Sequence, residues 1–294
     1  MMKCNYHTHS VFCDGKDSPE ELVKAALNKG FFALGFSSHS FTEMDKSFAL
    51  SPENAEKYRA EIAALKEKYI GKIELYCGIE QDYFSDEPTF AYDYVIGSVH
   101  YVLKNGEYVC VDNTAEIVKN AVNRLYGGDF DALAEDYFAL VANIAEKTNA
   151  DIIGHFDLVS KFSEKNGYGE SPRFLAAAER AVKALVPYGL PFEINTGTMA
   201  RGVRSLPYPS PEILKIIRKH GGEIMLSSDC HDKNYLDFAF LEAADLARKT
   251  GFTLAAVIKN GNIEYMKLKH RNKKCRKQIG VCRDESVTST LASL

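Results

Sequence analysis

Residues 94–100 have the sequence YVIGSVH, a short apolar run that ends on a histidine. A continuous apolar run of this length is typical of a strand that is buried on both faces of a sheet. Helical patterns separate most of the similar runs in this chain, which predicts a parallel sheet joined by crossover helices. We predict seven strands, at residues 3–7, 32–37, 73–79, 94–99, 152–154, 191–194 and 223–227.

The predicted helices are marked by residues that favour helix ends. Ser18 and Glu21 form a capping box and Gly30 follows the last periodic residue, so a helix is predicted over 19–29. The connection 85–93 is short and contains proline, so no full crossover helix is expected between the third and fourth strands. Apolar residues at helical spacing predict the other helices, at 53–69, 130–147, 172–186, 211–220 and 238–250.

The composition is that of a globular protein with a sizeable core, since 46% of the 294 residues are hydrophobic and 26% are charged. A barrel of alternating strands and helices reaches this length as one domain. The formal net charge of −4 provides no basic field that would draw the protein to nucleic acid or an anionic membrane. We therefore expect a small-molecule substrate, and neither nucleic acid nor a membrane as partner.

A cytoplasmic location is expected from the N-terminus and the cysteines. The first residues, MMKCNYHTHS, lack the apolar region of a signal peptide, and no apolar run approaches the roughly 18 residues of a membrane span. The seven cysteines are scattered without a C-x-x-C pair, which indicates reduced thiols and not a metal site.

The domain is expected to span residues 1–268, ending after a hairpin around 259–262. Seven Lys and Arg residues lie between 267 and 277, and the remaining segment has no hydrophobic periodicity. We interpret residues 269–294 as a solvated, mobile tail, basic and polar in character.

Six of the eight histidines lie at or just past the end of a predicted strand. Parallel strands open all their C-terminal ends on one face, so residues that are distant in sequence should converge there. The pairs His7/His9 and Asp229/His231 each place two polar side chains on one side of an extended chain. So many imidazoles are hard to satisfy without metal, and the number suits two or three ions. The candidate ligands are His7, His9, Asp14, His39, Glu80, His100, His155, Asp229 and His231.

These motifs in this order resemble the polymerase and histidinol phosphatase (PHP) family. They are H-x-H after the first strand, a lone His after the second, G-I-E after the third, S-V-H after the fourth, G-H-F-D after the fifth and S-D-x-H after the seventh. The match spans residues 4–232, and segments such as NYHTHS and GIEQDY resemble the monofunctional histidinol-phosphate phosphatases in particular. The resemblance implies an α/β fold, an irregular seven-stranded (β/α)7 barrel of TIM-like type.

The resemblance also implies a centre of three divalent metal ions, taken as zinc, with iron or manganese also suited to these ligands. One ion would be held by His7, His9, Glu80 and Asp229. A second ion would share Glu80 with His100 and His155, and the third would take Asp14, His39 and His231.

The implied reaction is the hydrolysis of L-histidinol phosphate to L-histidinol and phosphate, a step of histidine biosynthesis. Two ions that share Glu80 could hold a bridging hydroxide in line with phosphorus, so we assign catalytic roles to Glu80, Asp229 and His231. Fixed cations should bind the phosphate, and the candidates are Arg201, Arg204 and, less directly, Lys161. A carboxylate should bind the substrate amine, and the candidates are Asp82, Asp157 and Glu43.

Two alternatives remain open at this point. The same metal centre could hydrolyse another phosphomonoester, a nucleotide or the 3′ end of DNA, although the short chain without a basic body argues against DNA. A noncatalytic metal-binding module is the second alternative, and the presence of every expected ligand argues against it. The sequence does not determine the oligomeric state.

Overall fold

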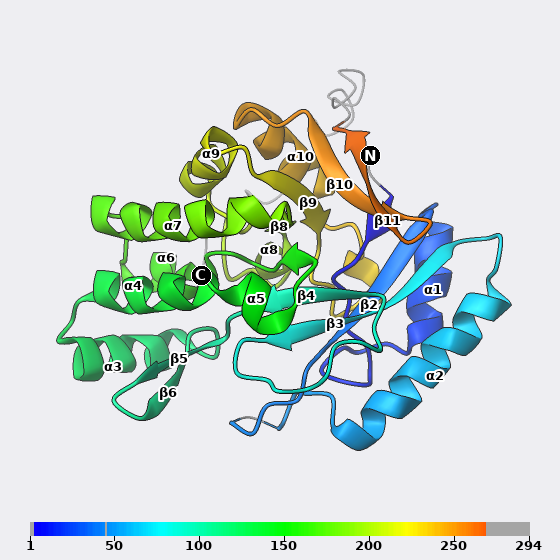
Figure 1. Ribbon diagram of the computed structural model, residues 1–294, viewed down its shortest axis with the longest axis horizontal. Coiled ribbons are helices and arrows are strands. Elements are labelled where there is room, and N and C mark those ends of the chain that lie inside the picture. The colour runs from blue at the N-terminus through cyan, green and yellow to red at the C-terminus, as the bar shows by residue number, and fades with distance from the viewer. Residues whose placement is uncertain (1–2, 45, 269–294) are drawn as a thin grey trace, which may run out of the picture.

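The computed structural model describes residues 3–44 and 46–268, and Figure 1 shows their arrangement. One sheet contains nine strands in the order β1-β2-β3-β4-β7-β8-β9-β10-β11, and β5 and β6 form a separate hairpin. Neighbours from β1 to β10 pair in parallel, and β11 is antiparallel to β10. The strands of the large sheet are β1 (Cys4–Asn5), β2 (Ala33–His39), β3 (Glu74–Asp82), β4 (Tyr94–Ser98), β7 (Ile152–Ile153), β8 (Pro191–Asn195), β9 (Glu223–Ser227), β10 (Leu254–Lys259) and β11 (Asn262–Lys267). The hairpin consists of β5 (Tyr101–Lys104) and β6 (Glu107–Cys110).

Four of the helices begin at a Ser-Pro pair: the serine side chain accepts a hydrogen bond from the first turn, and the fixed φ of proline suits the first helical position. In Figure 1, α1 and α2 lie to the right of the strands, and α3, α4 and α7 lie to the left. The helices are α1 (Pro19–Asn28), α2 (Pro52–Lys68), α3 (Ala115–Tyr126), α4 (Phe130–Val141), α5 (Ile144–Thr148), α6 (Ser163–Asn166), α7 (Pro172–Leu185), α8 (Gly197–Ala200), α9 (Pro211–Lys219) and α10 (Phe240–Lys249). None of the helices in the described part of the chain is long and apolar enough to cross a membrane.

The sheet curls so that the segment after β1 meets the segment after β9. The main-chain N–H of Cys230 donates to the His7 carbonyl at 3.0 Å, and the N–H of His9 donates to the Cys230 carbonyl at 2.8 Å. Below this contact, the buried Asn5 side chain donates to Ser228 Oγ at 2.8 Å and accepts from the Ser228 N–H at 3.2 Å. The first and the ninth strands of the chain are thereby held together at the end where both carry histidines.

The interior of the curled sheet is filled by aromatic side chains. Tyr94 is buried, and its hydroxyl donates to the main-chain carbonyls of Tyr6 and Phe36. Its phenol group lies against Gly35 of β2 and Gly78 of β3, where an added Cβ atom would overlap it. Close approach, and not an unusual backbone angle, therefore requires glycine at these two positions.

All seven predicted strands belong to the large sheet, and β10 and β11 extend it to nine. The described residues 83–93 contain no helix between β3 and β4, as expected, and the hairpin around 259–262 joins β10 to β11. The helix predicted over 130–147 is in fact two helices, α4 and α5, because the backbone leaves helical geometry at Asn143 (φ −107°, ψ 2°). Five elements were not predicted from the sequence: the strands β5 and β6, the helix α3 and the short helices α6 and α8. The predicted tail, 269–294, lies outside the described residues.

Replacing Gly78 by alanine is expected to lower the free energy of unfolding by about 1–3 kcal/mol, because the added methyl group would push against the buried Tyr94 ring. Chemical denaturation measures this change. Gly169→Ala is the matched control, since nothing lies within 4 Å of its Cβ position, and a change within about 0.5 kcal/mol is expected there. Equal stabilities for the two variants would contradict this account of the interior.

Candidate metal centre

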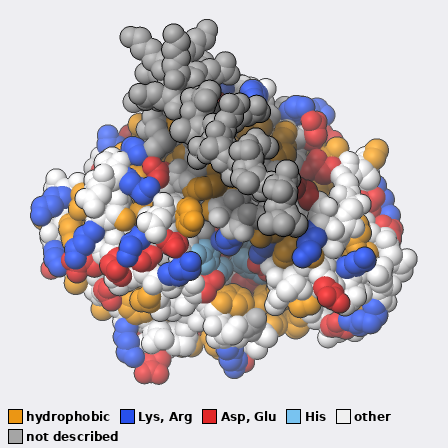
Figure 2. All heavy atoms as spheres, turned by 180° about the vertical axis from the view of Figure 1, so that it is seen from behind, with side chains coloured by type: hydrophobic (Ala, Val, Ile, Leu, Met, Phe, Trp, Pro, Cys, Tyr) orange, Lys and Arg blue, Asp and Glu red, His pale blue; other side chains and the backbone are white. Residues whose placement is uncertain are grey.

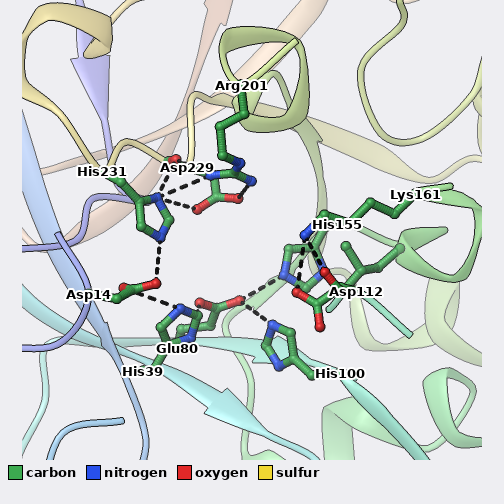
Figure 3. Close-up of a pocket in the computed structure, with 11 residues that line it drawn as sticks. Asp14, His39, Glu80, His100, Asp112, His155, Lys161, Arg201, Asp229 and His231 are labelled. Atoms are coloured by element: carbon green, nitrogen blue, oxygen red, sulfur yellow. Dashed lines mark hydrogen bonds and ion pairs between the residues drawn. The ribbon is translucent and has the colours of Figure 1, made fainter. Parts of the chain in front are cut away.

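The nine candidate ligands, which come from six strand ends and one loop, lie together at one end of the sheet. Every one of them is within 4 Å of at least one other through ring nitrogen and carboxylate oxygen. Figure 3 shows Asp14, His39, Glu80, His100, His155, Asp229 and His231 pointing toward one another around a pocket of about 240 Å³. In the space-filling view of Figure 2, histidine side chains are visible at the bottom of a hollow.

The Glu80 carboxylate lies at the centre of this cluster, with 1% of the residue exposed. Its position in β3 places it between strands that approach from both sides. One oxygen, Oε2, faces three imidazoles, with distances of 3.1 Å to His7 Nε2, 3.5 Å to His9 Nε2 and 2.9 Å to His39 Nδ1. The other oxygen, Oε1, faces His155 Nε2 at 2.8 Å and His100 Nε2 at 3.4 Å, and accepts from Ser98 Oγ at 2.8 Å.

Two further carboxylates complete the cluster. Asp229 Oδ1 lies 3.2 Å from His9 Nε2 and 3.6 Å from His7 Nε2. Asp14 lies in the loop after β1, where its Oδ2 is 3.1 Å from His231 Nε2 and its Oδ1 is 3.6 Å from His9 Nδ1. Asp14 from the loop after β1 and Asp229 from the segment after β9 therefore both face His9 and His231.

The spacing of the ligand atoms is suitable for metal. In each of three groups, one potential ligand atom per residue lies within 4.8 Å of all the others, and a single ion with bonds of about 2.0–2.3 Å can span nearly that distance. His9 and His39 each belong to two groups, which differs from the partition expected from the sequence, and His155 belongs to none. The groups are His9/Asp14/His39/His231, His7/His9/Asp229 and His39/Glu80/His100.

Several side-chain atoms of the candidate ligands are buried without a hydrogen-bond partner, although buried polar groups are normally paired. They are His7 Nε2, His9 Nε2, His155 Nδ1 and Glu80 Oε2. Imidazole nitrogens and carboxylate oxygens are the donors that zinc and similar divalent ions accept. The residues present therefore fit a divalent metal centre.

The electrostatics keep the carboxylates charged and one imidazole neutral. Burial alone would raise the pKa of Glu80, but His7 and His39 hold it well below its ordinary value. Burial likewise opposes ionisation of Asp229, whose pKa is held well below its ordinary value by Arg201 and His7. Burial lowers the pKa of His9 to about 3, and His231 and His39 act in the same direction. The His9 ring is therefore neutral at physiological pH, the state in which imidazole binds metal.

Two of the three predicted phosphate-binding residues line the pocket. The Arg201 guanidinium donates to Asp229 Oδ2 at 3.1 Å, and the Lys161 ammonium donates to the Asp112 carbonyl at 2.8 Å. The structure places Arg204 elsewhere: its side chain is buried, donates to Ser160 Oγ at 2.8 Å and lies over the Tyr208 ring. Both arginines follow β8, but only Arg201 turns toward the cluster.

None of the three carboxylates considered for the substrate amine lines the pocket. Asp82 is bound to His100 Nδ1 at 3.0 Å, Asp157 is buried 3.7 Å from Arg204, and Glu43 is exposed beside Lys46. Asp112, which the sequence analysis missed, does line the pocket. It follows the β5-β6 hairpin, whose mixed pattern gave no strand prediction, so no sequence signal placed it at the site.

Glu193, in β8, was likewise not predicted as part of the site. Its Oε1 lies 2.6 Å from His7 Nδ1, and only 1% of the residue is exposed. A charged residue inside an otherwise apolar predicted strand is the signal that could have found it, because buried carboxylates require partners.

Residues 5–197 match the PHP domain family. The chain belongs to this family. Two relatives bear the name “Probable histidinol-phosphatase”. The one from Deinococcus radiodurans is 30% identical over 259 residues, which cover 84% of this chain and 94% of the relative. The one from Schizosaccharomyces pombe is 26% identical over 285 residues, which cover 88% and 90%.

Solved structures share the fold of this PHP domain. A Listeria monocytogenes protein assigned as a histidinol phosphatase superposes with a TM-score of 0.72 at 19% identity, covering 81% of this chain and 98% of its own. The histidinol phosphate phosphatase from Lactococcus lactis, solved with zinc, L-histidinol and phosphate, gives a TM-score of 0.66 at 22% identity, covering 90% and 100%. At these identities the likeness concerns the α/β fold with its curled sheet.

Adding Zn²⁺ to chelator-treated protein is expected to raise the melting temperature, because an ion that binds only the folded state stabilises it. The gain is about 2.7 kcal/mol when free metal is a hundred times the dissociation constant. Thermal unfolding monitored with and without metal measures the shift. His9→Ala should reduce it, whereas His220→Ala should not, because His220 lies outside the cluster, bound to Glu179. An identical melting temperature with and without Zn²⁺ would argue against a metal centre.

Proposed function

We propose that this PHP domain is a metal-dependent phosphomonoesterase that hydrolyses L-histidinol phosphate to L-histidinol and phosphate. The observation that carries the proposal is the Glu80 carboxylate, buried among five imidazoles, with His7 Nε2 and His9 Nε2 left without a hydrogen-bond partner. The substrate is inferred from the Deinococcus radiodurans relative, which matches along 94% of its own length. The pocket beside Glu80 has charged groups of both signs, as a phosphate ester with an amine requires.

The proposed centre contains three divalent ions, taken as zinc. His9 and His39, which each belong to two of the geometric groups, would lie between ion positions. Glu80 would be shared by two ions, because its Oε2 faces His7, His9 and His39 whereas its Oε1 faces His100 and His155. When bound, such ions supply an activated water and neutralise the charge that develops on phosphate. The seven predicted strands, six of which carry these ligands, would then form the irregular (β/α)7 barrel of the proposal, with β10 and β11 as an extension.

The side chains at and near the pocket have separate proposed roles in catalysis and phosphate binding. Glu80, Asp229 and His231 are the proposed catalytic residues, since all three line the pocket in which the phosphate would bind. Arg201 is the proposed phosphate ligand, because its guanidinium lies at the pocket with 37% of its side chain exposed. Lys161 is a second cation of the pocket, beside Asp112 in Figure 3, whereas Arg204 is proposed to support Asp157 from within the core.

We propose Asp112 as the carboxylate that binds the substrate amine. It lines the same pocket as Glu80, and its ionised form is available to a cation. Burial would raise the pKa of Asp112, but Lys161 and His100 lower it to about 2. A protonated amine would therefore meet a charged carboxylate. The Lys161 ammonium already makes such a contact, 3.3 Å from Asp112 Oδ2.

Glu80→Gln and Arg201→Ala should fail in different ways. The first removes the negative charge between the imidazoles, so metal content and kcat should fall together. The second leaves the ligands in place and removes a charge-assisted contact to phosphate, with an expected loss of about 1.5–3 kcal/mol, or tenfold to a hundredfold in kcat/KM. Elemental analysis and kinetics on the same preparations separate the two. Glu80→Gln protein with full metal content and normal turnover would refute the shared position of Glu80.

Asp112→Asn should lower kcat/KM for histidinol phosphate about tenfold to a hundredfold, because one charged contact to the amine is lost. For p-nitrophenyl phosphate, which has no amine, a change of less than about threefold is expected. Glu43→Gln is the control, since that exposed carboxylate lies outside the pocket and should affect neither substrate. Equal losses of kcat/KM on both substrates would assign Asp112 a role other than amine recognition. Wild-type protein that hydrolyses nucleotides but not histidinol phosphate would contradict the proposed substrate.

A further inference from the structure

Glu193 lies directly behind the proposed metal centre, in β8, and is almost completely buried. Its carboxylate accepts four hydrogen bonds, which tie together the ends of four strands. The Oε1 atom accepts from His7 Nδ1 at 2.6 Å and from the Ser227 hydroxyl. The Oε2 atom accepts from the His155 main-chain N–H and from Asn195 Nδ2, both at 2.9 Å.

This contact decides which nitrogen of the His7 ring is free. The donors around Glu193 leave the carboxylate as an acceptor, so the proton between it and the ring belongs to His7 Nδ1. In the neutral ring, the form in which imidazole binds metal, the other nitrogen, Nε2, then presents a lone pair toward Glu80 Oε2 at 3.1 Å and Asp229 Oδ1 at 3.6 Å. With the ring neutral, three acceptors face one another in a buried space, and a metal ion between them would satisfy all three.

A second carboxylate repeats the arrangement on the other side of Glu80. Asp82 Oδ2 accepts from His100 Nδ1 at 3.0 Å and from the His100 main-chain N–H at 3.1 Å. This leaves His100 Nε2 directed at Glu80 Oε1, 3.4 Å away. The two imidazoles on opposite sides of the cluster are therefore oriented by carboxylates that do not themselves belong to any of the three ligand groups.

We infer that Glu193 is a positioning residue of the metal centre: it holds His7 with its Nε2 lone pair directed at the ion and, through the His155 main chain, aligns a second ligand. The inference rests on the proposed metal-dependent function. A carboxylate bound to the distal nitrogen of a ligating histidine fixes the ring and increases its basicity, and loss of such a partner typically weakens metal binding tenfold to a hundredfold.

The test is the zinc affinity of Glu193→Gln, measured by competition with a chromophoric chelator. The amide has the same shape, but its NH₂ group can donate to His7 Nδ1 and so favours the tautomer whose Nε2 carries the proton. We expect zinc affinity to fall about tenfold to a hundredfold. At saturating zinc, KM for the phosphoester should stay within about threefold of wild type, because Glu193 does not line the pocket.

Ser227→Ala is the matched control. It removes another hydrogen bond to the same Glu193 oxygen but leaves the contact to His7 in place. Both variants should lower the melting temperature of the metal-free protein to a similar extent, whereas Ser227→Ala should retain zinc affinity within about threefold. A purely structural role for Glu193 would weaken zinc binding equally in both variants, and that result would overturn the inference.

Glu193→Asp provides a second variant if the glutamine protein does not fold, because it keeps the charge and moves the carboxylate away from His7 by one methylene. Its zinc affinity should fall at least about fivefold. Wild-type affinity in either folded Glu193 variant would overturn the positioning role and leave the proposed function intact. Wild-type protein that binds no divalent ion would overturn both.

Discussion

The structure depends on one buried charge, the Glu80 carboxylate in the middle of the curled sheet. Such a charge is costly to bury unless it is surrounded by groups of complementary character. Here five imidazoles from strands on both sides approach its two oxygens. The sheet must curl for these strand ends to meet, so the fold and the site impose the same geometric requirement.

The residues behind the cluster show how that geometry is maintained. The Asn5–Ser228 contact holds β1 against the segment after β9, and the Tyr94 ring fills the interior between the strands. Glu193 adds hydrogen bonds that reach His7 and the His155 main chain. Side chains that are fixed by strands and by buried partners can be held more precisely than side chains on loops, which suits a centre with several ligands.

The mouth of the pocket is built differently. Asp14 lies in a loop with 34% of its side chain exposed, and Asp112 follows a hairpin outside the main sheet. Arg201 and Lys161 each neutralise a carboxylate of the pocket. Membership of the PHP family accounts for the buried cluster, and these outer groups are where selectivity for a particular phosphoester would be set.

The sequence by itself determined the seven strands and the nine polar residues at the C-terminal face, because a parallel strand brings the residue after its last apolar position to a common edge. It did not determine how those ligands are shared, since the groups around His9 and His39 depend on distances between strands that are far apart in the chain. Arg201 and Arg204 lie close together in the segment after β8, so the sequence does not distinguish them. Packing against Asp157 and Tyr208 directs Arg204 into the core. Asp112 follows a hairpin and Glu193 lies in a buried strand. Tertiary contacts, and not the local pattern of residues, determine which partners these two side chains have.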